Sequence, residues 1–226
     1  MEILKICCDA SVRYIYDRCF TCSGAISINT GRTKYEILPD STNNRGELWG
    51  VYLGCRLALE EKNMFPGRFE RINIYSDSQL VIYGLTRWIH AWIKSLDRSP
   101  NGIFLSSTGK PVANQNMFLM IITFCWINHL EVHFYNQKGH VNIHDRESLA
   151  DANDQFYTAN KHYLSPKELI ELSNYNNYID ETTRDILHRV DPKRYPVVYH
   201  NPEAIELCHY ILPPDFRQYI RKGSED

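Results

Sequence analysis

The chain has 226 residues, of which 43% are apolar and 12% are aromatic, and its formal net charge is -2. This much apolar material can form a large core, so the composition excludes a chain that is disordered throughout. The length suits one domain of about 150 residues with an addition. Because the net charge is close to zero, it points by itself to no class of partner.

The cysteines and the apolar runs bear on the compartment. Seven cysteines occur without a regular spacing. Cys19 and Cys22 have the spacing of half a zinc site, but no second pair completes it, so reduced and buried thiols are the better interpretation. No charged-then-apolar leader opens the chain, and no apolar run approaches the roughly 18 residues of a membrane span. We therefore expect a cytoplasmic protein without a membrane partner.

Hydrophobic periodicity predicts strands and helices in an order that defines the fold class. Strands are predicted over residues 1–8, 20–29, 33–38, 71–76 and 130–135. Helices are predicted over residues 43–62, 78–85, 88–96, 114–127 and 146–162. Since three strands come first and two are then interleaved with helices, we expect an α/β fold with a five-stranded mixed sheet. Strands 1, 2 and 3 would be antiparallel, strands 1, 4 and 5 parallel, and helices would flank the sheet.

The pattern changes after residue 162. Ser165, Pro166 and Glu168 occupy the N-cap, first-turn and capping-box positions of a predicted helix, and Asn201 with Pro202 marks a second helix start. We therefore expect a main domain over residues 1–162 and a small helical extension over residues 163–226. The apolar positions of the extension predict that it docks on the main domain or on a second copy, away from the reacting centre.

Two aspartates end predicted strands, and one glutamate begins the helix that lies between those strands in sequence. Asp9 ends the first strand, Asp77 ends the fourth, and Glu47 lies in the first turn of helix 43–62. If strands 1 and 4 are parallel neighbours, both aspartates stand at the sheet edge where ligands gather in α/β proteins. Either aspartate alone is more often a turn or capping residue. Three close carboxylates repel one another unless a cation lies among them, and Mg²⁺ prefers such oxygen ligands.

Five short motifs resemble those of type 1 ribonuclease H and occur in the same order. They are "TNNRGE" at 42–47, "SDSQ" at 76–79, "RWIHAW" at 87–92, "KPVAN" at 110–114 and "KGH" at 138–140. Each motif is weak alone, but five in register form a specific signal. The resemblance covers about residues 2 to 160, and it implies a ribonuclease H-like catalytic domain with an unmatched extension.

The resemblance implies roles for four acids around two Mg²⁺ ions, with Mn²⁺ as an alternative ion. Asp9 resembles the acid that bridges both ions, and Glu47 and Asp77 resemble the ligands of the ion beside the leaving group. Asp151 in the helix over 146–162 resembles the acid that holds the ion with the attacking water. Asp154 lies nearly a turn further on and is the less favoured choice.

His140 follows Lys138 and Gly139 in a loop, and it resembles the family's mobile histidine, which assists proton transfer or product departure. A histidine in a polar loop is otherwise more often an idle surface residue, and His144 lies close enough in sequence to be confused with it.

The resemblance also implies a surface for an RNA–DNA hybrid, whose RNA strand is recognised by its 2′-hydroxyls. Short amides both donate and accept hydrogen bonds, and cations beside an aromatic ring suit a DNA strand. The candidate nucleic-acid-binding residues are Thr42, Asn43, Asn44, Gln79, Arg87, Trp88 and Lys94. One departure affects this surface: Ala10 stands where the family commonly has a glycine, and the glycine-rich loop that follows it is absent.

The expected function is therefore an endoribonuclease that cuts the RNA strand of a hybrid and leaves 5′-phosphate and 3′-hydroxyl ends, without a small-molecule cofactor. Two alternatives stay open: a DNA-cutting relative of the resolvase or transposase type, and a non-catalytic scaffold that binds hybrids. A proofreading exonuclease is less favoured, because it would need an acid where Ser11 stands. The sequence does not define the oligomeric state.

Overall fold

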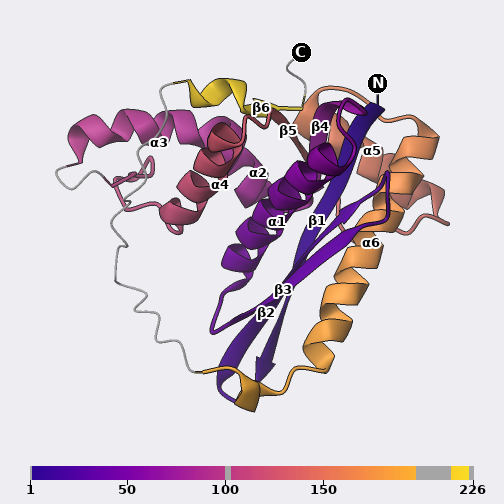
Figure 1. The fold of residues 1–226 in the computed structure, drawn as a ribbon, viewed down its shortest axis with the longest axis horizontal. Coiled ribbons are helices and arrows are strands. Elements are labelled where there is room, and N and C mark those ends of the chain that lie inside the picture. The colour runs from indigo at the N-terminus through magenta and orange to yellow at the C-terminus, as the bar shows by residue number, and fades with distance from the viewer. Residues whose placement is uncertain (1, 100–102, 197–214, 224–226) are drawn as a thin grey trace.

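A computed structural model describes residues 2–99, 103–196 and 215–223. Its strands form one sheet in the order β3-β2-β1-β4-β5-β6 (Figure 1). They are β1 (Glu2–Ile15), β2 (Arg18–Ser27), β3 (Thr33–Pro39), β4 (Phe69–Ser76), β5 (Val132–Asn136) and β6 (Ile220–Lys222). The pairs β1–β2 and β2–β3 are antiparallel, whereas β1–β4, β4–β5 and β5–β6 are parallel. The predicted mixed sheet is confirmed, and a short sixth strand is added to it.

The helices lie close to their predicted positions. They are α1 (Asn43–Met64), α2 (Gln79–Tyr83), α3 (Ile89–Ser95), α4 (Gln115–Ile127), α5 (Arg146–Asn160) and α6 (Pro166–His188). One π-helical turn over Gly84–Trp88 joins α2 to α3, so the two predicted helices run on from one another. No helix in the described part of the chain is long and apolar enough to cross a membrane.

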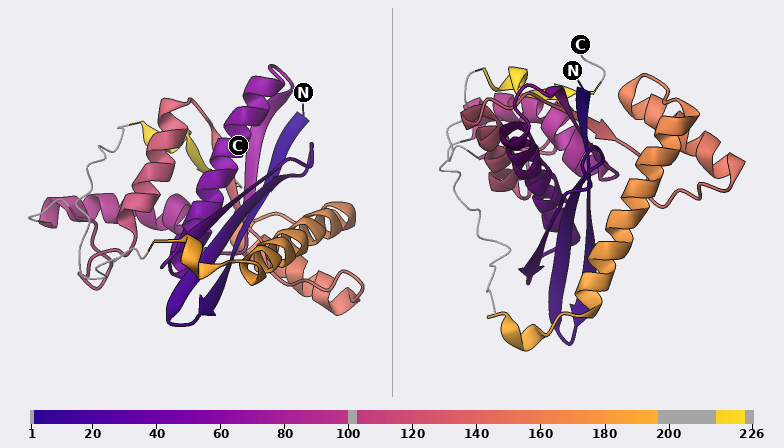
Figure 2. Two further views of the ribbon diagram at one scale, coloured as in Figure 1. Left: turned by 60° about the horizontal axis from the view of Figure 1, so that its bottom comes forward. Right: turned by 45° about the vertical axis from the view of Figure 1, so that its right-hand side comes forward.

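Helices cover both faces of the sheet (Figure 2). Alternate residues of a strand point to opposite faces, and β1 follows this rule. Ile6 and Cys8 join the core beneath α1 and α4, whereas Cys7 joins a second core that includes Ile179 of α6. The alternation of apolar residues in β1 therefore places a hydrophobic layer on each side of it.

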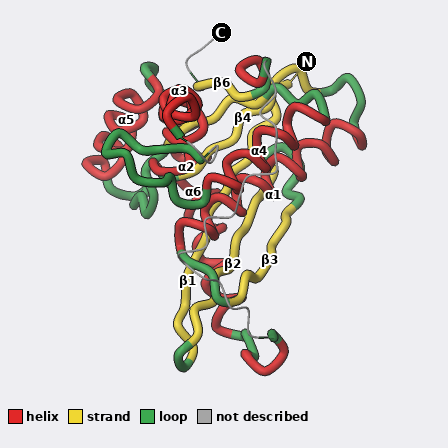
Figure 3. The backbone as a smooth tube through the Cα atoms, turned by 90° about the vertical axis from the view of Figure 1, so that its left-hand side faces the viewer, coloured by secondary structure: helices red, strands yellow, loops and turns green. Residues whose placement is uncertain are grey.

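β1 is longer than predicted, because its antiparallel pairing with β2 continues to Ile15, opposite Arg18. Its parallel pairing with β4 ends earlier, at Cys7 opposite Tyr75. The expectation that the strand stops at Asp9 is therefore wrong. Asp9 lies inside the strand but beyond the end of the parallel β1–β4 ladder. There the β1–β2 hairpin runs on past β4, while β3 stays paired with β2 as far as Pro39 opposite Phe20 (Figure 3).

The extension begins with α6, whose capping box is present as predicted. Ser165 Oγ accepts a hydrogen bond from the Glu168 amide at 3.3 Å, and Glu168 Oε2 accepts one from the Ser165 amide at 3.2 Å. α6 then crosses β1 and β2 on the face opposite α1. The extension thus docks on the main domain, as expected. The helix predicted from Asn201 lies outside the described residues.

Candidate active site

Three carboxylates from three elements meet just beyond the end of the parallel ladder between β1 and β4. Asp9 comes from β1, Asp77 directly follows β4, and Glu47 lies in the first turns of α1. One ligand oxygen from each lies within 4.8 Å of the others. Because β1 pairs in parallel with β4 up to Cys7 and Tyr75, Asp9 and Asp77 follow the same end of that ladder and are brought together with Glu47, as predicted.

Two glycines let α1 approach the sheet closely enough to place Glu47. A Cβ atom on Gly46 would lie 2.0 Å from Thr21 Cγ2, and one on Gly50 would lie 3.1 Å from the Asp9 carbonyl oxygen. A larger residue at Gly46 would push the start of α1 away from β2. The glycine of "RGE" is therefore needed for the close approach that brings Glu47 to Asp9.

Burial and mutual repulsion raise the pKa values of these three carboxyl groups. The pKa of Asp9 is raised from 3.8 to about 8, first by burial and then by the negative charge of Asp77. The pKa of Glu47 is raised by burial and then by Asp9. Burial also raises the pKa of Asp77, although a hydrogen bond from Asn176 opposes the shift. At neutral pH the cluster therefore favours a proton or a cation.

The residues present fit a hard divalent cation. Glu47 is buried and its Oε2 atom has no hydrogen-bond partner, although a buried acceptor left alone costs free energy. Its Oε1 atom accepts a weak hydrogen bond from Asn43 Nδ2 at 3.5 Å. An orphaned carboxylate oxygen beside two further carboxylates is the donor set expected of an ion such as Mg²⁺. The three acids would hold it.

The loop that carries His140 lies against Asp77. A Cβ atom on Gly139 would lie 2.1 Å from Asp77 Oδ2. Any other residue at position 139 would therefore displace the Asp77 carboxylate. His140 has a φ of 53° and an exposed side chain, and its Nδ1 lies 3.4 Å from Asp180 Oδ2. The predicted mobile histidine therefore lies at the site, next to an acid that was not predicted.

We expect Gly139→Ala to impair the site more than the fold. The added methyl group meets the end of the Asp77 side chain, which can turn away at small cost to stability but then leaves the cluster. Affinity for Mg²⁺, measured by calorimetry, should fall by about tenfold or more, since even a partner of a ligand contributes this much. The melting temperature without metal should change by only a few degrees. Unchanged Mg²⁺ affinity would show that the position of Asp77 does not depend on Gly139.

Asp151 does not join the cluster. It lies on α5, whose Ala152 and Phe156 face inward, and its own side chain is 52% exposed. A hydrogen bond and ion pair with Lys138 lower its pKa, a shift opposite to those of the buried acids. Asp154 is also exposed. α5 packs against β5, whereas α6 packs against β1. Neither Asp151 nor Asp154 is therefore brought to Asp9.

Residues of α6 occupy that side of the site. Asn176 Nδ2 donates to Asp77 Oδ2 at 3.5 Å. Asp180, Arg184 and His188 line the same open cleft as Asp9, Glu47 and Asp77, with a volume of about 510 Å³. The expectation that the extension stays away from the reacting centre is therefore wrong for α6. A polar residue at every fourth position, within an otherwise amphipathic helix, was the sequence signal for this contact.

The nucleic-acid-binding residues predicted at 42–44 and at Gln79 lie at the starts of α1 and α2. Thr42 caps α1, since its Oγ1 accepts a hydrogen bond from the Arg45 amide at 3.4 Å. Asn43 lines the cleft beside the acids. Asn44 and Gln79 are exposed at the starts of α1 and α2. These amides are free to approach a ligand, and their contacts with nucleic acid stay a prediction.

The residues predicted to contact the DNA strand differ in how exposed their side chains are. Trp88 is 42% exposed and Lys94 is exposed. Arg87, in contrast, donates to the Ala159 carbonyl at 2.6 Å and lies over the Tyr83 ring at 3.9 Å. Its guanidinium is thus engaged inside the protein. A phosphate contact by Arg87 stays a prediction and would have to use the donors that remain.

Sheet order, helix placement and the carboxylate cluster define an α/β protein with a candidate cation site at the end of its parallel strands. A family model for RNase H matches residues 2–155. The chain belongs to the ribonuclease H family.

The chain is similar to curated relatives and to solved structures. Ribonuclease HI of Haemophilus ducreyi is 32% identical over 107 residues, which cover 47% of this chain and 59% of the relative. Ribonuclease H of Actinobacillus succinogenes is 34% identical over 107 residues, covering 47% of this chain and 58% of the relative. The chain thus spans less than two thirds of the curated relatives that it matches.

Two solved structures are similar to part of the chain. LC9-RNase H1, described as a type 1 RNase H with the type 2 active-site motif, has a TM-score of 0.44 and 18% identity, covering 74% of this chain and 79% of that chain. The native Prototype Foamy Virus protease-reverse transcriptase has a TM-score of 0.49 and 12% identity, covering 83% of this chain and 21% of that chain.

Proposed function

We propose that this protein is an endoribonuclease that hydrolyses the RNA strand of RNA–DNA hybrids with divalent cations, Mg²⁺ foremost. The observation that carries the proposal is the cluster of Asp9, Glu47 and Asp77, with ligand oxygens within 4.8 Å, in a chain of the ribonuclease H family. The raised pKa of Asp9 supports the proposal, because the ionised form of this buried carboxyl group is stabilised when a cation lies beside it.

Two cations at such a site would supply an activated water and stabilisation of the leaving oxygen of a phosphodiester. The chain's own residues have other tasks. Asp9, Glu47 and Asp77 would fix the position of the cations. Because Asp9 and Glu47 are buried, bulk water would have little access to their side of the cations. His140, exposed on a loop that packs on Asp77, would carry a proton to or from the leaving oxygen.

Strand choice would follow from hydrogen bonding at the mouth of the cleft. Asn43 lines the cleft, and Asn44 and Gln79 are exposed amides at the starts of α1 and α2, so we expect all three to bond to 2′-hydroxyls. A DNA strand offers none, and each lost hydrogen bond costs on the order of 1 kcal/mol. Three together would disfavour duplex DNA by roughly a hundredfold.

The test is a cleavage assay on one sequence prepared as an RNA–DNA hybrid, duplex DNA and duplex RNA, with Mg²⁺ and with a chelator. We expect Mg²⁺-dependent internal cuts in the RNA strand of the hybrid alone, with 5′-phosphate and 3′-hydroxyl ends. End chemistry can be read by ligation and phosphatase treatment. Comparable cutting of duplex DNA would favour the resolvase or transposase alternative, and binding without any cutting would favour the scaffold.

A further inference from the structure

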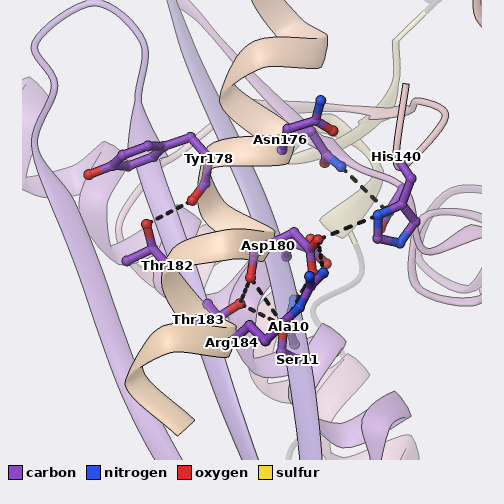
Figure 4. A network of polar contacts seen from close by, with 12 residues as sticks. Ala10, Ser11, His140, Asn176, Tyr178, Asp180, Thr182, Thr183 and Arg184 are labelled. Carbon is purple, nitrogen blue, oxygen red and sulfur yellow. Dashed lines mark hydrogen bonds and ion pairs between the residues drawn. The ribbon is translucent and has the colours of Figure 1, made fainter. Parts of the chain in front are cut away.

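Four polar residues spaced four apart on α6 face the candidate site. They are Asn176, Asp180, Arg184 and His188; the last three line the cleft, and Asn176 donates to Asp77. Residues at this spacing share one side of a helix. α6 thus presents a continuous polar edge to the cleft, next to the apolar face that it buries on β1 and β2. Figure 4 shows Asn176, Asp180 and Arg184 on α6, with His140 and Ser11 nearby.

Asp180 is the acid of this edge, and it is held in place from several sides. Its side chain is 13% exposed. Ser11 Oγ donates to Asp180 Oδ1 at 3.4 Å, which ties the carboxylate to β1 two residues beyond Asp9. Arg184 and His140 approach Asp180 Oδ2, the histidine at 3.4 Å. These contacts hold a charged carboxylate in a fixed position at the edge of the cleft.

Asp180 also acts electrostatically on all three clustered acids. Burial is the first cause of the raised pKa of Asp9, Glu47 and Asp77, and the negative charge of Asp180 adds to it in each case. It therefore increases the repulsion within a cluster that already contains the orphaned Glu47 Oε2. An arrangement of this kind is stable when cations neutralise it.

The contrast with Asp151 is plain. Asp151 lies on α5, is half exposed and is neutralised by Lys138. Asp180 lies on the helix that crosses β1 and lines the cleft with Asp9. Its oxygens are not in the 4.8 Å group of three, so it faces that group across the cleft from the α6 side.

We propose that Asp180 is the fourth carboxylate of the cation site, in the place that the sequence assigned to Asp151. Arg184 pairs with Asp180 while the site holds no cation, with His140 beside the same oxygen, and both give way when an ion enters. The identity of the ion and of the substrate rests on the proposed function, whereas the choice of Asp180 rests on the position of α6.

The experiment measures ion binding without substrate. Mn²⁺ and Mg²⁺ affinities are determined by calorimetry for the wild type, Asp180→Asn, Asp151→Asn and the control Asp185→Asn, which alters an exposed acid of the same helix. The ion-induced rise in melting temperature is recorded in parallel. We expect Asp180→Asn to weaken binding of at least one ion by tenfold or more and to lose most of the thermal rise. Asp151→Asn and Asp185→Asn should stay within threefold of the wild type.

A second variant guards against a simple folding defect. Arg184→Gln removes the cation that competes for Asp180, so ion affinity should be kept or rise severalfold. A tenfold loss in Asp151→Asn with wild-type affinity in Asp180→Asn would overturn the proposal, as would a tenfold loss in Arg184→Gln. Hybrid cleavage is assayed separately with the wild type. If ion binding depends on Asp180 but no hybrid is cut, the assignment of Asp180 stands and the proposed function fails.

Discussion

Asp9→Asn is expected to abolish cleavage of the hybrid while leaving the protein folded. Asp9 has a ligand oxygen within 4.8 Å of oxygens of Glu47 and Asp77, and its carboxylate would help to hold the bound cations. Loss of a residue that only supports a metal ligand already costs about 10–100-fold in affinity or activity, so loss of the ligand itself should cost more than this. Single-turnover cleavage of a labelled hybrid measures the loss.

The same variant should be more stable than the wild type at pH 8 when no divalent ion is present. The pKa of Asp9 is about 8 in the folded protein and 3.8 in the unfolded chain, so the folded state binds the proton more tightly. This contribution to stability is fully present below pH 3.8 and is lost as the pH rises through about 8. Asparagine does not ionise, so the variant does not lose this stability as the pH rises.

Thermal unfolding of both proteins at pH 5 and pH 8 in a chelator tests this point. The melting temperature of the wild type should fall between the two values by more than that of Asp9→Asn, and Mg²⁺ should restore the wild type at pH 8 but not the variant. Near-normal turnover in Asp9→Asn would contradict the central place of this residue. Equal pH dependence of the two melting temperatures would contradict the raised pKa of its carboxyl group.

The central acids could be predicted from the sequence because each is fixed by local signals and one topological rule. Asp77 follows an obvious strand, and Glu47 lies near the start of an obvious helix that follows a capping threonine. Parallel pairing of β1 with β4 then places Asp9 and Asp77 at the same edge. No side-chain contact had to be guessed, since the order of the strands determines the juxtaposition.

The α6 side of the site could not be predicted in the same way. Asp151 and Asp180 both lie on amphipathic helices, and the sequence pattern does not state which helix crosses β1. That choice depends on long-range packing, in which Leu172 and Ile179 complete a core with Cys7 of β1. Local propensity carries little information about such contacts, because tertiary packing decides them.

β1 and β6 illustrate the same limit. The pairing of β1 with β2 beyond Asp9 continues a hairpin register that the sequence leaves open. β6 spans Ile220–Lys222 and exists because it pairs with β5. Neither length nor alternation identifies a strand this short. Both features depend on a neighbouring strand.

Ile179→Asp is expected to unfold the protein, because α6 is part of the fold. Ile179 is fully buried between the helix and the sheet. An unpaired carboxylate at this position would lose the burial of an isoleucine, about 2 kcal/mol, and would add a desolvation penalty of several kcal/mol. Domains of this size are stable by only about 5–15 kcal/mol. Circular dichroism and urea titration should show a strongly lowered or absent cooperative transition.

Tyr178→Asp is the matched control, since Tyr178 precedes Ile179 on the same helix and is 50% exposed. It should melt within a few degrees of the wild type.

A chain that ends at His162 should behave like Ile179→Asp, because it lacks Leu172, Ile179 and Leu187, all buried against the rest of the protein. If that shortened chain is monomeric, melts cooperatively and cuts hybrids in Mg²⁺, then residues 1–162 form an independent domain. In that case α6, with its Asp180, would be dispensable for both fold and site.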